Sequence, residues 1–411
     1  EENFIDCIIW KKRYGGGAKE KYLVNLHEYI LMFSKNKDYI KTITIPNNKE
    51  FIEKYYTKTD KKFNERGPYR TQPLEAAKSM GERKNLVYDI PGPNGNIISP
   101  KRQWLWSKER TMVALQNDDL EFNQDKDGIW TVNIKQYQFD VDGNERTLKV
   151  TTILENIYTQ HGTKEIEKIF GNVDYFPYPK PSSIVKFIAK FGSDKEDIIL
   201  DFFSGSASTA QGIIDLNNEV NTARKYILVQ MPEKTDEKSE AFKAGYETIS
   251  DIGKERIRRV IKKINKEQEG KLDLEGNENQ DLGFKVFKLQ KSNFKIWRTK
   301  IESKEQLLNQ MQEHLEPLDE NAELEYVLYE LLLKSGISLT AKIVEKEGFY
   351  LVNDNEIALI LNKVNKDIMK AVIEQKPRKV ITLDRLFNNN DQLKTNTALQ
   401  MKDAEIEFKV V

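Results

Sequence analysis

Cysteine and histidine are scarce in this chain: its 411 residues include one cysteine and three histidines. A single cysteine excludes a disulfide framework within the chain and a zinc site built from several thiolates. The three histidines, His27, His161 and His314, lie far apart and show no metal-ligand spacing. We therefore predict no metal site.

An excess of charge of one sign is also absent, because 65 Lys and Arg residues balance 65 Asp and Glu residues. Overall charge thus gives no indication of a nucleic-acid partner, and a DNA-binding surface would have to come from local clustering of cations. No apolar run is long enough to cross a membrane. These features favour a cytoplasmic protein that does not associate with membranes.

The most informative pattern present is a short apolar run that ends in a carboxylate, Ile198 to Asp201, followed by small residues and a helical pattern from Ser208 to Asn217. Strand, small-residue turn and helix form the cofactor-binding corner of a doubly wound α/β sheet. Small residues let the turn backbone approach a ligand, and the first helical N–H groups can act as donors. The alternative is an ordinary strand-to-helix turn without a ligand.

This turn differs from two common phosphate-binding loops. No Gly-Lys-Ser/Thr follows it, so the lysine of a P-loop is missing. Its spacing also fails the Gly-x-Gly-x-x-Gly dinucleotide fingerprint, and no histidine is placed for hydride transfer. A nicotinamide dehydrogenase is therefore disfavoured.

Two neighbouring segments add polar groups to the predicted site. A second strand pattern ends at Gln230, with Glu233 three residues on, where doubly wound folds place a side chain on ribose hydroxyls. The alternative is that both residues only cap the strand. Upstream, Pro179-Lys180-Pro181-Ser182 should rigidify the approach to the next helix, with Ser182 as its N-cap.

The rest of the chain divides by composition. Residues 36–165 are basic, aromatic and rich in turn signals, which favours an irregular inserted module. Apolar residues at near-helical spacing predict a long helix over 249–264, and the polar stretch 266–280 reads as a linker. A Leu-rich helix is predicted over 324–333.

The order of these motifs resembles that of the β-class N6-adenine DNA methyltransferases. More narrowly, nearly the whole chain resembles the Mod subunit of type III restriction–modification systems. The resemblance implies a Rossmann-like S-adenosylmethionine-dependent methyltransferase domain with an inserted target-recognition module and a C-terminal α+β domain. Its expected boundaries are a methyltransferase remnant at 1–50, the insertion at 51–164, the S-adenosylmethionine half at 165–268 and the C-terminal domain at 269–411.

The resemblance also implies a cofactor, a substrate and partners. S-adenosylmethionine is the expected cofactor, and the methyl acceptor is adenine N6 in a short site of double-stranded DNA. The partners are a second Mod subunit, in a homodimer, and a Res subunit with ATP-dependent translocase and nuclease activity. The expected cofactor-binding residues are Lys180, Pro181, Asp201, Phe202, Phe203, Ser204, Gly205, Ser206, Ala207, Gln230 and Glu233.

The sequence departs from the family pattern in two places. The family loop usually has a further glycine where this chain has Ala207, whose methyl would crowd the methionine end of the cofactor or fit if φ is negative. The family's catalytic tetrapeptide, an acidic or amide residue followed by Pro-Pro-Tyr, should lie upstream of Asn3, and the chain contains no Pro-Pro. We therefore expect a chain that begins inside its methyltransferase domain, place no catalytic residue in it and expect no methyl transfer by it alone. The alternative is a non-catalytic DNA-binding or assembly subunit.

Clustered cations in the insertion form the predicted DNA-reading surface, because base and phosphate contacts need Arg and Lys on accessible segments. Trp104 and Trp106 lie among them and are predicted to be core residues, and the Lys61-Lys62 pair is predicted to be a solvated face. The predicted DNA-binding residues are Arg66, Arg70, Arg83, Lys84, Lys101 and Arg102.

Overall fold

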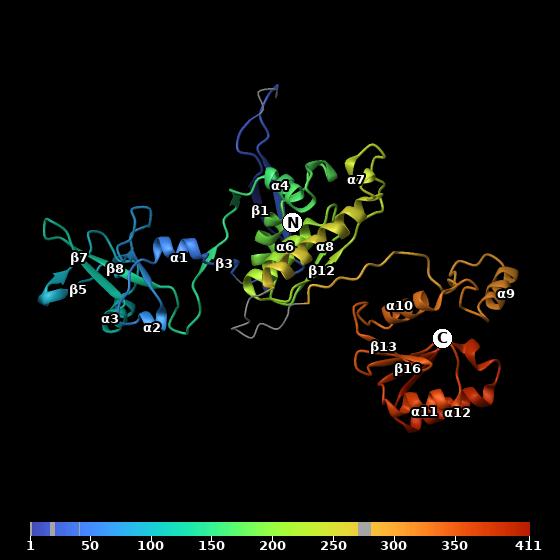
Figure 1. Cartoon of the computed structure of the whole chain (residues 1–411). Coiled ribbons are helices and arrows are strands. Elements are labelled where there is room, and N and C mark those ends of the chain that lie inside the picture. The colour runs from blue at the N-terminus through green and yellow to red at the C-terminus, as the bar shows by residue number, and fades with distance from the viewer. Residues whose placement is uncertain (1, 17–20, 41, 270–280) are drawn as a thin grey trace. The chain divides into compact units, whose positions relative to one another are not determined.

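The computed structural model describes residues 2–16, 21–40, 42–269 and 281–411 (Figure 1). The chain forms two compact units, Glu1–Leu282 and Gly283–Val411. Most of the predicted linker, 270–280, lies outside the described residues. Within the described residues, no helix combines the length and the apolar character needed to span a membrane.

The first unit contains a three-stranded sheet in which β1 (Phe4–Lys11) pairs antiparallel with β2 (His27–Phe33) and parallel with β10 (Ile153–Leu154). One face of this sheet buries Ile8 and Trp10 against α5 (Ser182–Gly192). The opposite face leaves Tyr29, Leu31 and other apolar side chains exposed. The apolar run at 4–10 thus forms a strand, and the run at 27–35 forms one over most of its length.

A separate parallel pair, β11 (Ile198–Asp201) and β12 (Lys225–Leu228), follows the predicted pattern. Helices α5 and α6 (Ser208–Val220) bury one face of this pair around Ile213 and Leu216. Its other face exposes Leu200 and Ile227, although parallel sheets usually have both faces covered. The doubly wound arrangement therefore stays a prediction, because these two strands and the β10–β1–β2 sheet are separate sheets.

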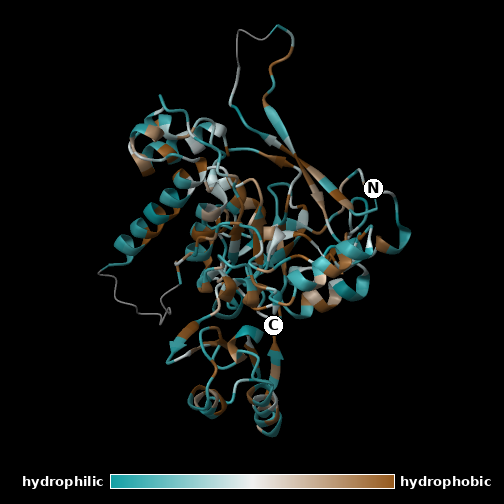
Figure 2. Cartoon of the chain, turned by 90° about the vertical axis from the view of Figure 1, so that its right-hand side faces the viewer, coloured by the Kyte–Doolittle hydropathy of each residue, from teal (hydrophilic) through white to brown (hydrophobic). Residues whose placement is uncertain are grey.

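Helices α4 (Thr159–Phe170), α7 (Glu240–Lys243) and α8 (Ile249–Gln268) complete this part of the unit. In α8 the buried stripe includes Ile252, Val260 and Ile264, as the spacing predicted. The side chain of Thr248 accepts from the Asp251 N–H, and the Asp251 carboxylate accepts from the Thr248 N–H, so a capping box begins the helix. Figure 2 shows hydrophobic and hydrophilic residues alternating along the helices.

Residues 44–149 form a substructure that begins and ends in the antiparallel pair β3 (Thr44–Pro46) and β9 (Thr147–Lys149). It contains an antiparallel sheet in the order β4-β8-β7, so it is more regular than the sequence predicted. Trp104 is buried in its core with Leu74 and Ile134, as predicted, and Trp106 packs partly buried against the same core. Its other elements are α1 (Lys49–Tyr55), α2 (Phe63–Arg66), β4 (Tyr69–Pro73), β5 (Ile90–Pro91), β6 (Ile97–Ile98), α3 (Lys108–Gln116), β7 (Leu120–Gln124) and β8 (Trp130–Tyr137).

The second unit is built on a five-stranded sheet in the order β13-β14-β15-β16-β17. The pairs from β13 to β15 are antiparallel, and those from β15 to β17 are parallel. Helix α10 covers one face, while α11 and α12 cover the other (Figure 1). The bounds are α9 (Lys304–Glu313), α10 (Leu324–Lys334), β13 (Ile343–Lys346), β14 (Phe349–Val352), β15 (Ile357–Ile360), α11 (Lys366–Glu374), β16 (Lys379–Thr382), α12 (Asp391–Asp403) and β17 (Glu407–Val410).

Candidate functional site

The turn between β11 and α6 is held by the carboxylate of Asp201. Its Oδ1 accepts from the Phe203 N–H at 3.0 Å, and its Oδ2 accepts from Thr209 Oγ1 at 2.5 Å. One carboxylate thus connects the end of the strand to the turn and to the first turn of the helix. These two hydrogen bonds restrain the turn at its strand end and at its helix end.

Gln230 holds the same turn from the second strand. Its Oε1 accepts from the Gly205 N–H at 2.7 Å, so the amide contacts the turn rather than only capping the strand. Glu233 is exposed, and its carbonyl oxygen accepts from the Ile249 N–H at the start of α8. The structure therefore brings Gln230 to the predicted loop, and it places Glu233 at the connection to α8.

Two residues of the turn have left-handed backbone conformations. Gly205 has φ of +50° and Ala207 has φ of +61°, values that glycine adopts readily and alanine rarely. Of the two alternatives for the Ala207 methyl, the fit at negative φ does not apply, because φ is positive here. Ala207 is instead buried against α8, where a Cβ on Gly253 would lie 3.4 Å from the Ala207 Cβ.

The remaining turn residues divide between an exposed and a buried side. Phe202 and Phe203 are 62% and 84% exposed, and their ring centroids lie 5.1 Å apart. Ser204 and Ser206 are buried. The turn therefore presents two aromatic rings outward while its hydroxyl groups face the protein.

Beneath the turn, a fully buried guanidinium connects three helices and the turn itself. Arg256 of α8 donates from Nη1 to Ser206 Oγ at 2.9 Å, from Nε to Gln211 Oε1 at 2.8 Å and from Nη2 to Glu165 Oε2 at 2.8 Å. Burial lowers the pKa of Arg256, and the nearby Glu165 carboxylate opposes that shift. The sequence did not single out Arg256, although it lies four residues from both Ile252 and Val260 on the apolar stripe.

Glu165 also binds the first residue of α5, which corrects the prediction for Ser182. The Ser182 N–H and Oγ both donate to the Glu165 carboxylate, at 3.0 and 2.9 Å. Pro181 occupies the N-cap position, and Ser182 is already helical. Ser182 is therefore not the N-cap, and its hydroxyl bonds to the mostly buried Glu165 carboxylate of α4.

Lys180 lies at the β1–β2 sheet. Its ammonium pairs with Glu28 of β2 and lies 5.0 Å from the ring centroid of Trp10. Partial burial acts to raise the pKa of Glu28, but hydrogen bonds from Lys180 and Lys12 hold it below its usual range. The structure thus directs this predicted cofactor ligand toward β1 and β2.

The six predicted DNA-binding cations fall into two groups. Arg66 is mostly buried, pairs with Asp119 at 2.9 Å and lies 4.2 Å from the ring centroid of Tyr137. Arg70 donates to Gln136 Oε1 at 3.0 Å. The other four are exposed on the loops around 83–84 and 101–102: Arg83, Lys84, Lys101 and Arg102.

Lys62 differs from its predicted role as part of a solvated face. Its ammonium donates to Asp119 Oδ1 at 2.8 Å and to the Asn117 carbonyl, and its side chain is only one-fifth exposed. The half-buried Asp119 carboxylate already pairs with Arg66 and draws in this second cation. Only Lys61 fits the prediction.

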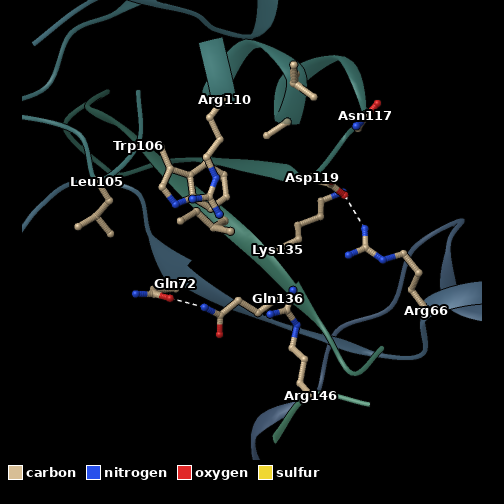
Figure 3. A pocket seen from close by; sticks show the side chains of 13 residues that line it. Arg66, Gln72, Leu105, Trp106, Arg110, Asn117, Asp119, Lys135, Gln136 and Arg146 are labelled. Atoms are coloured by element: carbon tan, nitrogen blue, oxygen red, sulfur yellow. Dashed lines mark hydrogen bonds and ion pairs between the residues drawn. The ribbon is translucent and has the colours of Figure 1, made fainter. Parts of the chain in front are cut away.

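A cavity of about 380 Å³ lies between α3 and the β4–β8 strands (Figure 3). Arg110 stacks over Trp106 there, with its guanidinium carbon 4.1 Å from the ring centroid. Polar side chains reach the cavity from both strands, and the sequence singled out only one of its cations, Arg66. The polar lining residues that it missed include Gln72, Arg110, Lys135, Gln136 and Arg146.

The family model for DNA methylases matches residues 1–235, so the chain belongs to the DNA methylase family. Among individual relatives, the type III restriction-modification enzyme StyLTI Mod subunit of Salmonella typhimurium is 30% identical over 70% of this chain and 41% of its own length. The EcoP15I Mod subunit of Escherichia coli is 26% identical over 97% of this chain and 64% of its own length. The type II methyltransferase M.KpnI of Klebsiella pneumoniae is 28% identical over 63% of each chain.

These similarities confirm the predicted resemblance to Mod-type adenine methyltransferases. The chain spans 41% and 64% of the lengths of the two Mod relatives named above. The predicted domain boundaries and the individual site residues remain predictions.

Proposed function

We propose that the chain binds S-adenosylmethionine at the turn 201–207. The observation that carries this proposal is the pair of side-chain anchors, Asp201 and Gln230, that fix the turn backbone at the carboxyl ends of two parallel strands. Ligands of open α/β sheets bind at such ends. The exposed Phe203 ring adds an apolar surface next to this backbone.

The reaction proposed for the family member is methyl transfer to adenine N6 within a short site of double-stranded DNA. S-adenosylmethionine would supply the methyl group. Asp201 and Gln230 would hold the turn that binds it, and the Phe203 ring would exclude water from one side of the bound cofactor. Membership of the DNA methylase family and similarity to Mod subunits support this activity. The proposed partners are a second Mod subunit and a Res subunit, and the proposed compartment is the cytoplasm.

None of the 411 residues is proposed as the base-receiving group, because the Pro-Pro of the family tetrapeptide does not occur in the sequence. We propose that this polypeptide alone binds cofactor and DNA without transferring methyl groups. Incorporation of tritiated methyl into a library of all short duplex sites tests this. Adenine methylation by the polypeptide alone would contradict it, and failure to bind S-adenosylmethionine while binding DNA would favour a non-catalytic subunit.

Cofactor binding is tested by titration calorimetry of S-adenosylmethionine into two variants, each of which replaces one of two equally exposed aromatic residues. Phe203 and Tyr39 are both 84% exposed, so replacing either with alanine should leave folding intact. Phe203→Ala should weaken S-adenosylmethionine binding by at least tenfold, because an aromatic ring buried by a ligand contributes about 1.5–3 kcal/mol. Tyr39→Ala should bind normally. Binding of NAD without S-adenosylmethionine would instead favour a dehydrogenase.

A further inference from the structure

Three side chains on β4 and β8 form a directed chain of hydrogen bonds beside the cavity. Arg70 Nε donates to Gln136 Oε1 at 3.0 Å, and Gln136 Nε2 donates to Gln72 Oε1 (Figure 3 shows the second bond). Arg70 and Gln136 are direct cross-strand partners, and Gln72 is opposite Ile134 on the same face. Strands hold such groups more rigidly than loops do.

Arg70 fixes the donor-to-acceptor direction of this series of hydrogen bonds. A guanidinium only donates, so the Gln136 atom that faces Arg70 must be the amide oxygen. The other terminal atom of Gln136 is then its NH₂, which must face the oxygen of Gln72. The exposed end of this series of hydrogen bonds is therefore the NH₂ group of Gln72, whose two N–H donors are directed away from Gln136.

The surroundings favour a polyanion. Among the cations of the cavity, Arg66 pairs with Asp119, and Lys135 pairs with Asp60 and Asp118. Arg110 instead stacks on Trp106, and Arg146 donates to the Tyr137 carbonyl at 2.8 Å. Neither of these two contacts is with a carboxylate, although Arg146 also interacts electrostatically with Asp140. The Arg110 guanidinium in particular suits a phosphate group beside Gln72.

We propose that Gln72 determines sequence specificity by donating both N–H groups to a guanine, at O6 and N7 in the major groove of DNA. A glutamine that uses its oxygen and nitrogen together favours adenine. The bond from Gln136 occupies one lone pair of the Gln72 oxygen and turns that oxygen toward β8, so the NH₂ group faces away from β8 and its donors match the two acceptors of guanine. Gln136 and Arg70 are positioning residues. The proposal rests on the proposed DNA-methylase function.

The test is selection of bound duplexes from a random-sequence pool, with the full chain and its variants. The wild-type chain should select a short site that contains a guanine. Gln72→Ala should lose the preference for that guanine by roughly 5- to 100-fold while other positions of the site are kept. Gln72→Glu, which can only accept, should prefer cytosine or adenine at the same position.

The positioning role of Gln136 is tested by a second measurement, the base that a Gln136 variant prefers. Gln136→Leu removes the donor to Gln72 and releases the Gln72 oxygen, so the preference should move from guanine toward adenine. A merely structural role would lower stability without changing the preferred base. Gln124→Ala is the control, because Gln124 is exposed on β7 and its side-chain amide donates across its own turn to the Gly128 carbonyl.

Titration with S-adenosylmethionine separates this proposal from the function on which it rests. A wild-type chain that binds the cofactor and selects a site, together with a Gln72→Ala variant that keeps every preference, overturns the proposal alone. A wild-type chain that binds no cofactor and selects no site overturns both. Thermal unfolding measured on each variant shows whether a variant that loses its base preference has also lost its fold. If Gln72→Ala does not fold, Gln72→Glu tests the proposal, because that variant is expected to prefer a different base rather than to lose all preference.

Discussion

At the scale of single residues, the proposed cofactor turn depends on polar side chains whose hydrogen-bond partners are buried beneath it. Arg256 has no solvent exposure and is bonded to Ser206, Gln211 and Glu165. Removing a charge from water is costly, and such a pair is retained only when its geometry and additional hydrogen bonds offset that cost. The Arg256–Glu165 pair meets this condition directly beneath the proposed cofactor turn.

Replacing Arg256 with methionine should therefore be strongly destabilising. It leaves the mostly buried Glu165 carboxylate without its cation, and breaking such a pair costs about 3 kcal/mol in the free energy of unfolding. Arg258→Met on the same helix is the control, because that side chain is 58% exposed and its ion pair with Glu255 is superficial. Urea denaturation followed by fluorescence compares the two. Equal effects of the two substitutions would contradict a supporting role for the buried pair.

A second residue-scale prediction concerns Asp60. Desolvation acts to raise its pKa, but hydrogen bonds from Lys135 and Tyr137 lower it to about 2 from an ordinary 3.8. Because the folded state binds the proton less tightly than the unfolded state, this carboxylate stabilises the fold above pH 4. That contribution, about 1–2 kcal/mol, is lost as the pH falls from about 4 to about 2.

Asp60→Asn should remove this contribution at neutral pH. The difference in unfolding free energy between the wild type and Asp60→Asn should shrink toward zero as the pH approaches 2. Asp127→Asn, at an exposed position in the β7–β8 turn, should show no comparable difference. Urea titrations from pH 7 to pH 2 measure both variants. A difference that stays constant over this range would show that the Asp60 charge is not what stabilises the sheet.

At the scale of elements, the decisive contact is between helix α8 and the cofactor turn. A Cβ on Gly253 would lie 3.3 Å from the Gly205 carbonyl oxygen and 3.4 Å from the Ala207 Cβ. The 3.3 Å contact is tighter than an ordinary one, so the Gly205 carbonyl must move by a few tenths of an ångström. The glycine therefore lets the helix approach a turn that is already held by Asp201 and Gln230.

Gly253→Ala should weaken S-adenosylmethionine binding while changing stability little. Alanine favours a helix over glycine by about 1 kcal/mol, and the displaced turn offsets that gain. Gly192→Ala in α5 is the control, because its nearest neighbour would be the Ile188 methyl at 4.0 Å. That variant should keep its cofactor affinity in calorimetry. Normal binding by Gly253→Ala would show that the turn tolerates the shift.

At the scale of the whole molecule, the two units have separate cores. In the second unit, α10 packs on one face of the five-stranded sheet around Leu332, and α11 and α12 pack on the other around Val372 and Met401. Both faces of that sheet are therefore buried within 283–411 itself. A sheet covered on both sides has the features of an independently folding domain.

Residues 283–411 expressed alone should consequently fold and unfold cooperatively. The isolated segment should give dispersed amide resonances and a single thermal transition. The same transition should appear in the full chain after selective destabilisation of the first unit by Arg256→Met. Collapse of the isolated segment into a state without fixed tertiary structure would show that its core needs the first unit.

The sequence by itself determined the family and several elements, although it did not predict the regular β4-β8-β7 sheet of the insertion. The strand, turn and helix at 198–217 and the stripe of α8 follow from periodicity and turn chemistry, which act between residues close in the chain. The order of the motifs was sufficient to identify the family, because each motif consists of residues close in the chain and no long-range contact was needed to recognise it.

Only the tertiary structure decided which polar groups meet. Arg256 and Glu165 are 91 positions apart, Gln136 and Gln72 are 64 apart, and Lys180 pairs with a residue 152 positions away. No spacing rule predicts such partners, because a charged or amide group bonds to whatever complementary group the packing brings within reach. For that reason the sequence did not predict that Lys180 pairs with Glu28, that Gln230 bonds to the Gly205 N–H or that Gln136 bonds to Gln72.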